Sequence, residues 1–355
     1  MFSGSYDPAD VTFLLKPVAL EPTDVAAKET LIQSGRMHYS EMLSPEVPPG
    51  AAYLALYDTA LERNGMRLAQ DVASLAAALD ARSAGRAEIV LASLARAGTP
   101  IGILLARALR RLGRKVGHYS ISIIRDRGID QVALAHIAAR HDPADAVFVD
   151  GWTGKGTIAG ELRASLADTA FSPFLAVIAD PAGRADLAAT HDDYLIASGL
   201  LNAVVSGLVS RSILNDRLIG PGDFHGCVHY PDLAAHDLSR AFVERIDALA
   251  TAMTARSLAA EPDSRARLAV ECAALVDTLM ASSGTTDRNR IKPGIAEATR
   301  ALLRRLPDRL LVRDISDPDV AHLLHLAASL GLRADLLPAG GRYRAVAVIK
   351  SLGDG

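Results

Sequence analysis

The sequence is poor in the residues that stabilise small secreted proteins or anchor membrane proteins. Aromatic residues make up 5% of the 355 residues, so any core is built from aliphatic side chains. Two cysteines, Cys227 and Cys272, are too few for a disulfide framework or a four-thiolate metal site. The most apolar stretch, 197–214, is too polar and too short to span a bilayer, and the first residues do not resemble a signal peptide. We expect a cytoplasmic protein without a membrane segment.

The net charge is also small, but it is unevenly distributed along the chain. The net charge of −3 argues against a protein that coats nucleic acid along its whole surface. Between Arg288 and Arg313, however, eight residues are basic and only Glu297 and Asp308 are acidic. This basic segment (288–313) predicts a separate binding function for the C-terminal part.

Half of the residues are hydrophobic, and their spacing changes along the chain. Residues 1–50 are interrupted by prolines, with one expected helix at 23–39 that begins near Thr23 or Asp24. Apolar residues then recur at helical spacing over 51–81, which we interpret as two helices broken at Asn64-Gly65. The first 84 residues are therefore expected to form a helical N-terminal extension.

An alternation of strands and helices begins at residue 85. Short apolar runs at 88–94, 115–124, 146–149 and 174–178 are separated by stretches of helical length, which indicates βαβ units and a parallel sheet. The loops after Leu94, Ile124 and Val149 should meet at one edge of this sheet. The predicted fold class is thus α/β.

Beyond this sheet, helices are expected at 198–215 and over most of 239–281. The core with its helical extension is assigned to 85–285, and a basic linker or helix to 286–305. The remainder, 306–355, is expected to be a small α/β domain with strands at 309–314, 333–337 and 343–350, a helix at 319–330 and a hairpin-type turn at 338–342.

The stretch AVFVDGWTGKGTI, 146–158, is the strongest local signal. A buried strand ends on Asp150 and opens into a Gly/Thr loop before a helix, an arrangement suited to an anion. A nucleotide-binding P-loop requires glycine five positions before Gly154-Lys155 and Ser or Thr after the lysine. Those positions hold Val149 and Gly156, so the P-loop interpretation is excluded.

Strand, acid and loop together resemble the type I phosphoribosyltransferases. The resemblance implies that Asp150 is a catalytic residue that holds the ribose hydroxyls of phosphoribosyl diphosphate. Gly151, assigned to substrate binding, departs from the family, which usually has a second acid at this position. The resemblance further implies that the loop binds the 5′-phosphate through Thr153, Gly154, Lys155, Gly156 and Thr157.

Two further loops support that resemblance. In the family, the loop after the first core strand binds diphosphate, which places Arg96 as a catalytic group beside Ala97, Gly98 and Thr99. A departing diphosphate requires cationic and amide donors and a divalent metal, here Mg²⁺. Arg125, also assigned a catalytic role, and Arg127 follow the second strand and would serve as clamps, or alternatively form a surface salt-bridge cluster.

A narrower resemblance covers about residues 2–285. The runs FSGSYDPADVTFLLKP, SLARAGTPIG, HYSISIIRDRGID and FVDGWTGKG are similar to the StiP family, found with tellurium-resistance stress genes and named for a cysteine protease. The C-terminal unit resembles Pelota-type RNA-binding domains. The implied function is a Mg²⁺-dependent phosphoribosyltransferase, expected to be a homo-oligomer, with a nucleobase-like acceptor and RNA as a second partner.

Two other functions remain open. The chain is alternatively a non-catalytic protein that senses phosphoribosyl diphosphate or nucleotides, or that is directed to RNA, as Gly151 and the basic segment suggest. As a cysteine protease it would use Cys227, which His225 and His229 flank at two residues on either side. No nucleophile-bearing helix start or oxyanion loop accompanies this thiol, and Cys272 is expected to lie in the core.

Overall fold

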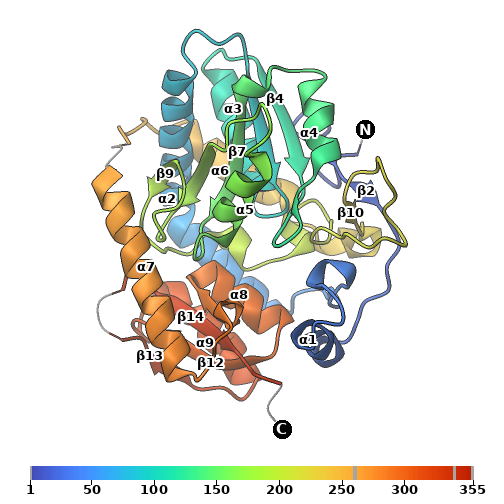
Figure 1. Ribbon diagram of the computed structural model, residues 1–355. Helices are drawn as coiled ribbons and strands as arrows, with labels where there is room; N and C mark the ends of the chain where they lie inside the picture. The colour runs from blue at the N-terminus through green and yellow to red at the C-terminus, as the bar shows by residue number, and fades with distance from the viewer. Residues whose placement is uncertain (1, 259–261, 339–340, 353–355) are drawn as a thin grey trace.

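Residues 2–258, 262–338 and 341–352 are described in the computed structural model of the chain. A larger α/β core forms the upper part of Figure 1, and a smaller C-terminal domain, in orange and red, lies beneath it. In the described residues no helix combines the length and the apolar character needed to cross a membrane.

The core is built on a six-stranded sheet whose neighbouring strands are all parallel. Its order is β1-β4-β3-β7-β8-β9. The bounds are β1 (Thr12–Leu14), β3 (Ile89–Leu94), β4 (Val116–Ile121), β7 (Ala146–Trp152), β8 (Leu175–Ala179) and β9 (Leu187–Thr190). The predicted parallel sheet is confirmed, with the addition of β1, a three-residue strand too short to stand out in the sequence.

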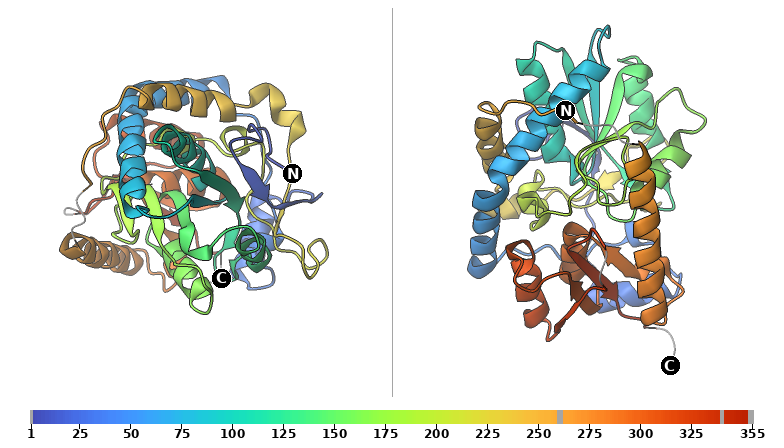
Figure 2. Two further views of the ribbon diagram at one scale, coloured as in Figure 1. Left: turned by 90° about the horizontal axis from the view of Figure 1, so that it is seen from above. Right: turned by 90° about the vertical axis from the view of Figure 1, so that its left-hand side faces the viewer.

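Each central strand is buried on both faces, because helices cover both sides of the sheet. Leu91 and Val149 face the side covered by α2 (Ala51–Arg82) and α3 (Gly98–Arg111). Ala92 and Phe148, one position away along their strands, face α4 (Gln131–Ala138) and α5 (Thr157–Leu166). Figure 2 shows α2 running along one flank of the whole molecule.

The predicted break at Asn64-Gly65 is wrong, since α2 is continuous over 32 residues. Tertiary contacts override the turn preference of this pair. The Asn64 amide donates to the Leu195 carbonyl (2.8 Å) and to Asp319 (2.9 Å). Gly65 lies under α6 (Ser239–Ala250), where an added Cβ would stand 3.4 Å from Leu249 Cδ1.

The helix expected over 198–215 is also absent from this fully described stretch. It contains 3-10 turns at Ala197–Gly199 and Ala203–Val205 and isolated bridges to the segment 226–229. Gly207 has a left-handed φ of 83°, which is incompatible with an α-helix, and an added Cβ there would stand 3.0 Å from the Tyr6 ring. The neighbouring two-stranded sheet pairs β2 (Lys16–Pro17) with β10 (Gly226–Cys227).

The C-terminal domain has a four-stranded sheet of order β11-β14-β12-β13. Its elements are α7 (Pro262–Ser282), β11 (Ile291–Pro293), α8 (Ile295–Arg304), β12 (Pro307–Val312), α9 (Ala321–Ser329), β13 (Ala334–Leu336) and β14 (Ala345–Ile349). The segment 286–305, predicted as a basic linker or helix, contains the strand β11 and the helix α8. β13 pairs with β12, not with β14, so no hairpin joins them, and residues 339–340 of the expected turn lie outside the described residues.

The N-terminal extension reaches the C-terminal domain through α1 (Val25–Gln33). The Asp24 side chain accepts hydrogen bonds from Ala26 N and Ala27 N, which confirms the predicted start of this helix. Figure 1 shows α1 beside the C-terminal domain. Glu29, fully buried, binds the Arg305 guanidinium there, so the first helix helps to hold the last domain.

Candidate functional site

A cavity of about 320 Å³ lies where the carboxyl edge of the core sheet meets the C-terminal domain. Its walls come from the loops after β3, β5 (Ile123–Ile124) and β7, from β11 and α8, and from α1. The convergence of three loops predicted from the sequence is thus found. This volume is within the usual range of small-molecule sites.

The cavity wall is strongly basic. Nine basic side chains line it, against only two acidic ones, Asp150 and Glu297. The basic residues are Lys28, Arg96, Arg125, Lys155, Arg211, Lys292, Arg300, Arg304 and Arg305. Four of these cations have carboxylate partners, which are Glu46 for Arg96, Asp126 for Arg125, Glu297 for Arg300 and Glu29 for Arg305. The other five repel one another and the paired ones unless an anion lies among them.

Asp150 and Arg96, predicted as catalytic, both line the cavity. Burial raises the pKa of Asp150 to about 7, with Arg300 opposing the rise. One guanidinium nitrogen of Arg96 donates to the Val209 carbonyl (2.9 Å), and Glu46 lies 3.8 Å away. Burial lowers the pKa of Arg96. Its hydrogen bond to Val209 and its pairing with Glu46 hold this guanidinium from the core side.

Arg125 lines the same cavity, at the end of β5. Its side chain is paired with Asp126 at 2.9 Å, and its guanidinium carbon lies 5.0 Å from the centroid of the Tyr39 ring. Arg127 is outside the cavity lining; it pairs with Glu41 at 3.3 Å and is nearly half exposed. The surface-pair alternative therefore applies to Arg127.

The loop after β7 lines the cavity from Trp152 through Thr157. Gly156 has a left-handed φ of 86° and precedes α5, whose first turn receives no side-chain cap. The Lys155 amine donates to the carbonyls of Arg288 and Ile291, which ties the loop to the C-terminal domain. The Thr153 hydroxyl is used by Asp180, so this side chain has a structural partner rather than a free hydroxyl.

Three of the residues assigned to a diphosphate loop lie away from the cavity. Ala97 lines a smaller adjoining niche. At Gly98 an added Cβ would be 2.3 Å from the Val149 carbonyl oxygen, so this glycine allows α3 to approach β7. The Thr99 hydroxyl is buried against Ser120 Oγ (2.7 Å). Gly151 is buried beside Ala97 and is likewise absent from the lining.

The opposite wall was not predicted as part of this site. Lys292 of β11, Arg300 and Arg304 of α8 and Arg305, the residue after α8, belong to the basic segment and line the cavity. Lys28 and Arg211 complete the wall, and no local sequence signal marks either of them. The basic segment was the only available signal, and it does not reveal which side its residues face.

Burial and mutual repulsion shift the titration of the cavity lysines. Burial, with repulsion from Lys155 and Arg305, lowers the pKa of Lys292 to about 7. Burial lowers the pKa of Lys155 and of Lys28 to about 8. These are the shifts expected when lysines are buried beside other cations.

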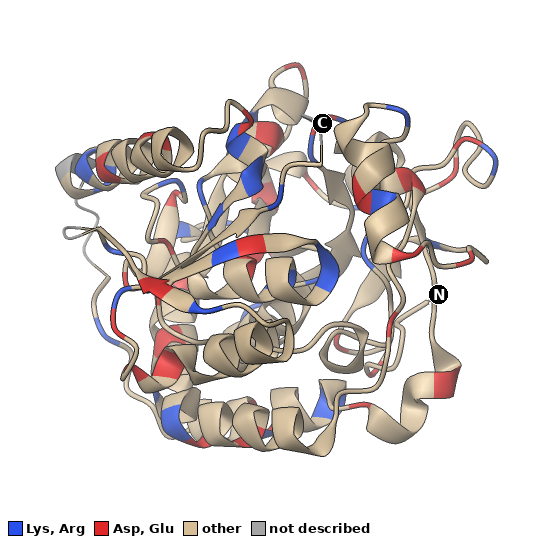
Figure 3. Ribbon diagram, turned by 90° about the horizontal axis from the view of Figure 1, so that it is seen from below, with Lys and Arg blue, Asp and Glu red and all other residues tan. Residues whose placement is uncertain are grey.

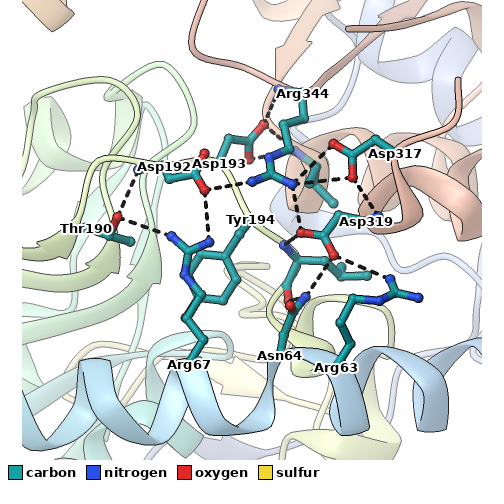
Figure 4. A network of polar contacts seen from close by, with 12 residues as sticks. Arg63, Asn64, Arg67, Thr190, Asp192, Asp193, Tyr194, Asp317, Asp319 and Arg344 are labelled. Atoms are coloured by element: carbon teal, nitrogen blue, oxygen red, sulfur yellow. Dashed lines mark hydrogen bonds and ion pairs between the residues drawn. The ribbon is translucent and has the colours of Figure 1, made fainter. Parts of the chain in front are cut away.

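A network of polar contacts holds the C-terminal domain on the core (Figure 4). Arg344 pairs with Asp192 of the core (2.7 Å) and with Asp317 (3.2 Å) and Asp319 (3.1 Å) of its own domain. The buried carboxylate of Asp193 accepts from Ile295 N at the start of α8 (3.1 Å). This network orients α8, and with it one wall of the cavity.

Outside the cavity, basic and acidic residues are more evenly mixed. Figure 3 shows basic and acidic residues interspersed on the molecule seen from below. Several basic residues of the C-terminal domain outside the cavity are paired, such as Arg309 with Asp335 at 3.2 Å. The excess of positive charge is therefore a property of the cavity.

Cys227 lies in a different environment. Its side chain is fully buried in the core, and burial raises the pKa of the thiol to about 12. His225 Nδ1 lies 2.8 Å from Ser122 Oγ, while the His229 ring packs edge-on against Phe2. Neither flanking histidine has a recorded contact with the sulfur, and within the described residues no cluster of His, Cys, Asp and Glu fits a metal ion. Cys272, as expected, is buried, and the Tyr343 hydroxyl lies 2.9 Å from its sulfur.

Comparison with known proteins gives the family. Residues 4–247 match the family described as tellurite-like stress resistance cysteine protease StiP, and residues 270–351 match the PELOTA RNA binding domain. A protein from Acinetobacter baylyi, named cysteine protease StiP, is 45% identical over all of this chain and 96% of its own length.

Similarity to solved structures is much lower. The hypoxanthine phosphoribosyltransferase of Trypanosoma cruzi covers 37% of this chain and 81% of its own, at 14% identity and a TM-score of 0.30. The enzyme of Leishmania tarentolae in complex with GMP covers 37% and 82%, with 14% identity and a TM-score of 0.29. These scores support no conclusion about activity.

The predicted Mg²⁺-dependent phosphoribosyltransferase function is therefore wrong. Both the matched family and the 45% identical relative bear the name of a cysteine protease, not of a transferase. The resemblance to the StiP family and to a Pelota-type domain is confirmed. The chain belongs to the StiP family of tellurite-like stress resistance proteins and carries a C-terminal PELOTA domain.

Proposed function

We propose that this chain binds a phosphate-bearing anion in the cavity between its core and its C-terminal domain. The observation that carries the proposal is that nine basic but only two acidic side chains line the cavity. An anion among these groups would offset their repulsion.

A phosphate fits this wall better than a singly charged group does. The uncapped first turn of α5 presents backbone N–H groups at the cavity, and the positive end of the helix dipole favours an anion there. Guanidinium groups such as Arg300 and Arg304 offer paired donors that match phosphate oxygens. The amides of α5 and the guanidinium groups of α8 can therefore bind different oxygens of the same phosphate group.

The phosphate can belong to a free molecule or to the end of an RNA strand, since the PELOTA match supports RNA as a partner. Calorimetric titrations with inorganic pyrophosphate, with a short 5′-phosphorylated oligoribonucleotide and with the same oligonucleotide lacking the phosphate distinguish the sources. Binding of pyrophosphate alone indicates a small ligand, and preference for the phosphorylated strand indicates an RNA end. Absence of binding in all titrations would refute the proposal.

Mg²⁺ remains a prediction from the sequence, and the cavity limits how it would enter. Asp150 and Glu297 are the two carboxylates available, and cations surround both. A free divalent cation is repelled there, so Mg²⁺ would arrive already bound to ligand phosphates. The same titrations with and without Mg²⁺ test this. Light scattering tests the predicted homo-oligomer.

A second candidate function is a cysteine protease, which the name of the 45% identical relative favours. With Cys227 as nucleophile and His225 as base, the thiol would have to leave its buried position and lose a proton. A fluorogenic casein assay on the full-length protein tests this. Activity lost in Cys227→Ala but kept in Cys272→Ala would establish the protease function, and equal activity of both variants would remove Cys227 from it.

A further inference from the structure

We propose that Lys292 is a reactive amine that forms a reversible imine with a small aldehyde carrying a phosphate group. The inference rests on the proposed anion site and goes beyond it, because it assigns covalent chemistry to one residue of the cavity wall. The phosphate would be held by the neighbouring cations, and the carbonyl carbon would face the amine.

The three lysines of the cavity differ in what their amines contact. The Lys28 amine donates to the carbonyl of Arg304 (3.0 Å) and also binds the Ser44 hydroxyl. The Lys155 amine donates to two backbone carbonyls of the segment before and within β11. For Lys292, no hydrogen bond or ion pair is recorded with any described residue, so its amine has no bond to break before it reacts.

The position of Lys292 is fixed by the strand that carries it. β11 pairs antiparallel with β14, and Lys292 is in register with Ala347. The strand also contacts the loop after β7, because the Ile291 carbonyl accepts from Lys155 (3.1 Å). Lys292 is therefore held at the cavity wall, next to the loop that leads into α5.

The charges around Lys292 favour both the neutral amine and the approach of an anion. Burial lowers its pKa most, and repulsion from Lys155, from Arg305 just after α8 and from Arg125 adds to this, while Glu297 of α8 opposes them. Desolvation beside other cations is an established way to activate a lysine as a nucleophile. At neutral pH a large share of this amine is uncharged, unlike that of an exposed lysine.

The chemistry requires no oxidant or reductant. The Nζ lone pair attacks the carbonyl carbon, and the carbonyl oxygen takes up a proton to give a carbinolamine. Loss of the hydroxyl group together with the one hydrogen that remains on nitrogen releases water and leaves a C=N bond in place of the C=O bond. Water entering the cavity reverses the reaction, so the aldehyde is released unchanged.

Pyridoxal 5′-phosphate, an aldehyde with a phosphate group, tests the proposal on the full-length protein. Brief incubation at pH 7, trapping with borohydride and peptide mass spectrometry should locate the label mainly on Lys292. Pyridoxal, which lacks the phosphate, should label this residue at least about 10-fold less, and pyrophosphate should compete with the labelling. The exposed Lys115 serves as an internal control, since its side chain is 77% exposed.

Two variants separate reactivity from folding. Lys292→Arg keeps the positive charge but removes the amine, and it should lose the label while its unfolding transition stays close to that of wild type. Lys115→Arg should keep it. Labelling spread evenly over surface lysines, or located on Lys28 or Lys155, would overturn the proposal. If the wild-type protein binds pyrophosphate but Lys292 is not labelled, the imine proposal is refuted and the anion site is retained. If the wild-type protein does not bind pyrophosphate, the anion site itself is refuted.

Discussion

Two regions of this molecule hold groups capable of chemistry, the basic cavity and the β2–β10 strand pair that carries Cys227. The cavity gathers cations from four parts of the chain around a space of about 320 Å³. The strand pair buries its thiol in an apolar core, where nothing stabilises the thiolate. Positive charge that is confined and only partly paired favours a bound anion, whereas a thiol with a raised pKa is inert until the fold opens.

The largest expected difference is in thiol reactivity. A pKa near 12 reduces the thiolate fraction of Cys227 about 1000-fold relative to a free cysteine, before burial is counted. Native protein treated with iodoacetamide at pH 8 should therefore leave Cys227 unmodified for hours, and the same treatment in urea should label it fully. Mass spectrometry of the peptide containing Cys227 measures the rates. Rapid labelling of native protein would reverse the comparison and favour the protease.

Removing two guanidinium groups should strongly weaken anion binding. Arg300→Gln combined with Arg304→Gln removes two charged donors, each worth about 1.5–3 kcal/mol, so pyrophosphate affinity should fall about 100-fold or more. The matched control is Arg309→Gln with Arg313→Gln, outside the cavity lining of the same domain. Calorimetry compares the two double variants. Equal affinity would place the anion elsewhere.

Arg344→Met tests how far the cavity depends on docking of the C-terminal domain. The change leaves Asp192, Asp317 and Asp319 without their shared cation, and breaking a largely buried ion-pair network costs about 3 kcal/mol. Urea unfolding should show this loss, and pyrophosphate binding should weaken with it. Arg309→Met breaks an exposed pair and should change the free energy of unfolding by less than about 1 kcal/mol. Equal effects of both variants would show that the network does not hold the domain.

Anion affinity should rise as the pH falls. The pKa values of Lys28 and Lys155 are near 8 and those of Lys292 and Asp150 near 7, so lowering the pH from 9 to 6 adds positive charge and removes one negative charge. Sulfate keeps its charge over this range and is the suitable probe, with binding about 10-fold tighter at pH 6. Asp150→Asn should reduce the change without abolishing it. A flat profile would contradict the lowered lysine pKa values.

The smallest effect is expected at Gly151, the position where the sequence lacks a second acid. An added Cβ there would meet Ala97 O at 3.4 Å, an ordinary contact, so Gly151→Ala should change anion affinity by less than about 2-fold. At Gly154 the added Cβ would stand 2.9 Å from Glu297 Cγ. Gly154→Ala should therefore weaken binding several-fold in the same titration. A large effect of Gly151→Ala alone would show that the phosphate depends on the backbone at this position.

Much of the core could be predicted, because local composition decides it. Runs such as 88–94 and 174–178 are apolar, short and separated by helical stretches, and these features require a buried parallel sheet. The start of α1 at Asp24 followed from capping preference. By contrast, Asn64-Gly65 carries a turn signal that contacts with Leu195, Asp319 and α6 override, and those contacts are distant in sequence.

The part of the candidate site that the core loops supply was predicted from the sequence, and the part that the C-terminal domain supplies was not. Asp150, Arg96, Arg125 and the loop from Thr153 to Thr157 follow buried strands, so their convergence at one sheet edge was predictable. Gly98 and Thr99 lie outside the cavity lining, where they serve the packing of α3 against the sheet, and small residues after a strand can have this role as readily as ligand binding. The residues on neither side of the cavity identified the activity of the protein. The family match then contradicted the predicted transferase function.

The sequence by itself determined the parallel sheet, the loop that follows Asp150 and the excess of positive charge in the segment 288–313. Only the tertiary structure decided that this charge faces inward. Arg344 and Asp193 fix the orientation of α8, and Glu29 of α1 holds Arg305 from the far end of the chain. The physical reason is that electrostatic energy depends on distance in space and on burial, and neither is encoded by neighbours along the chain.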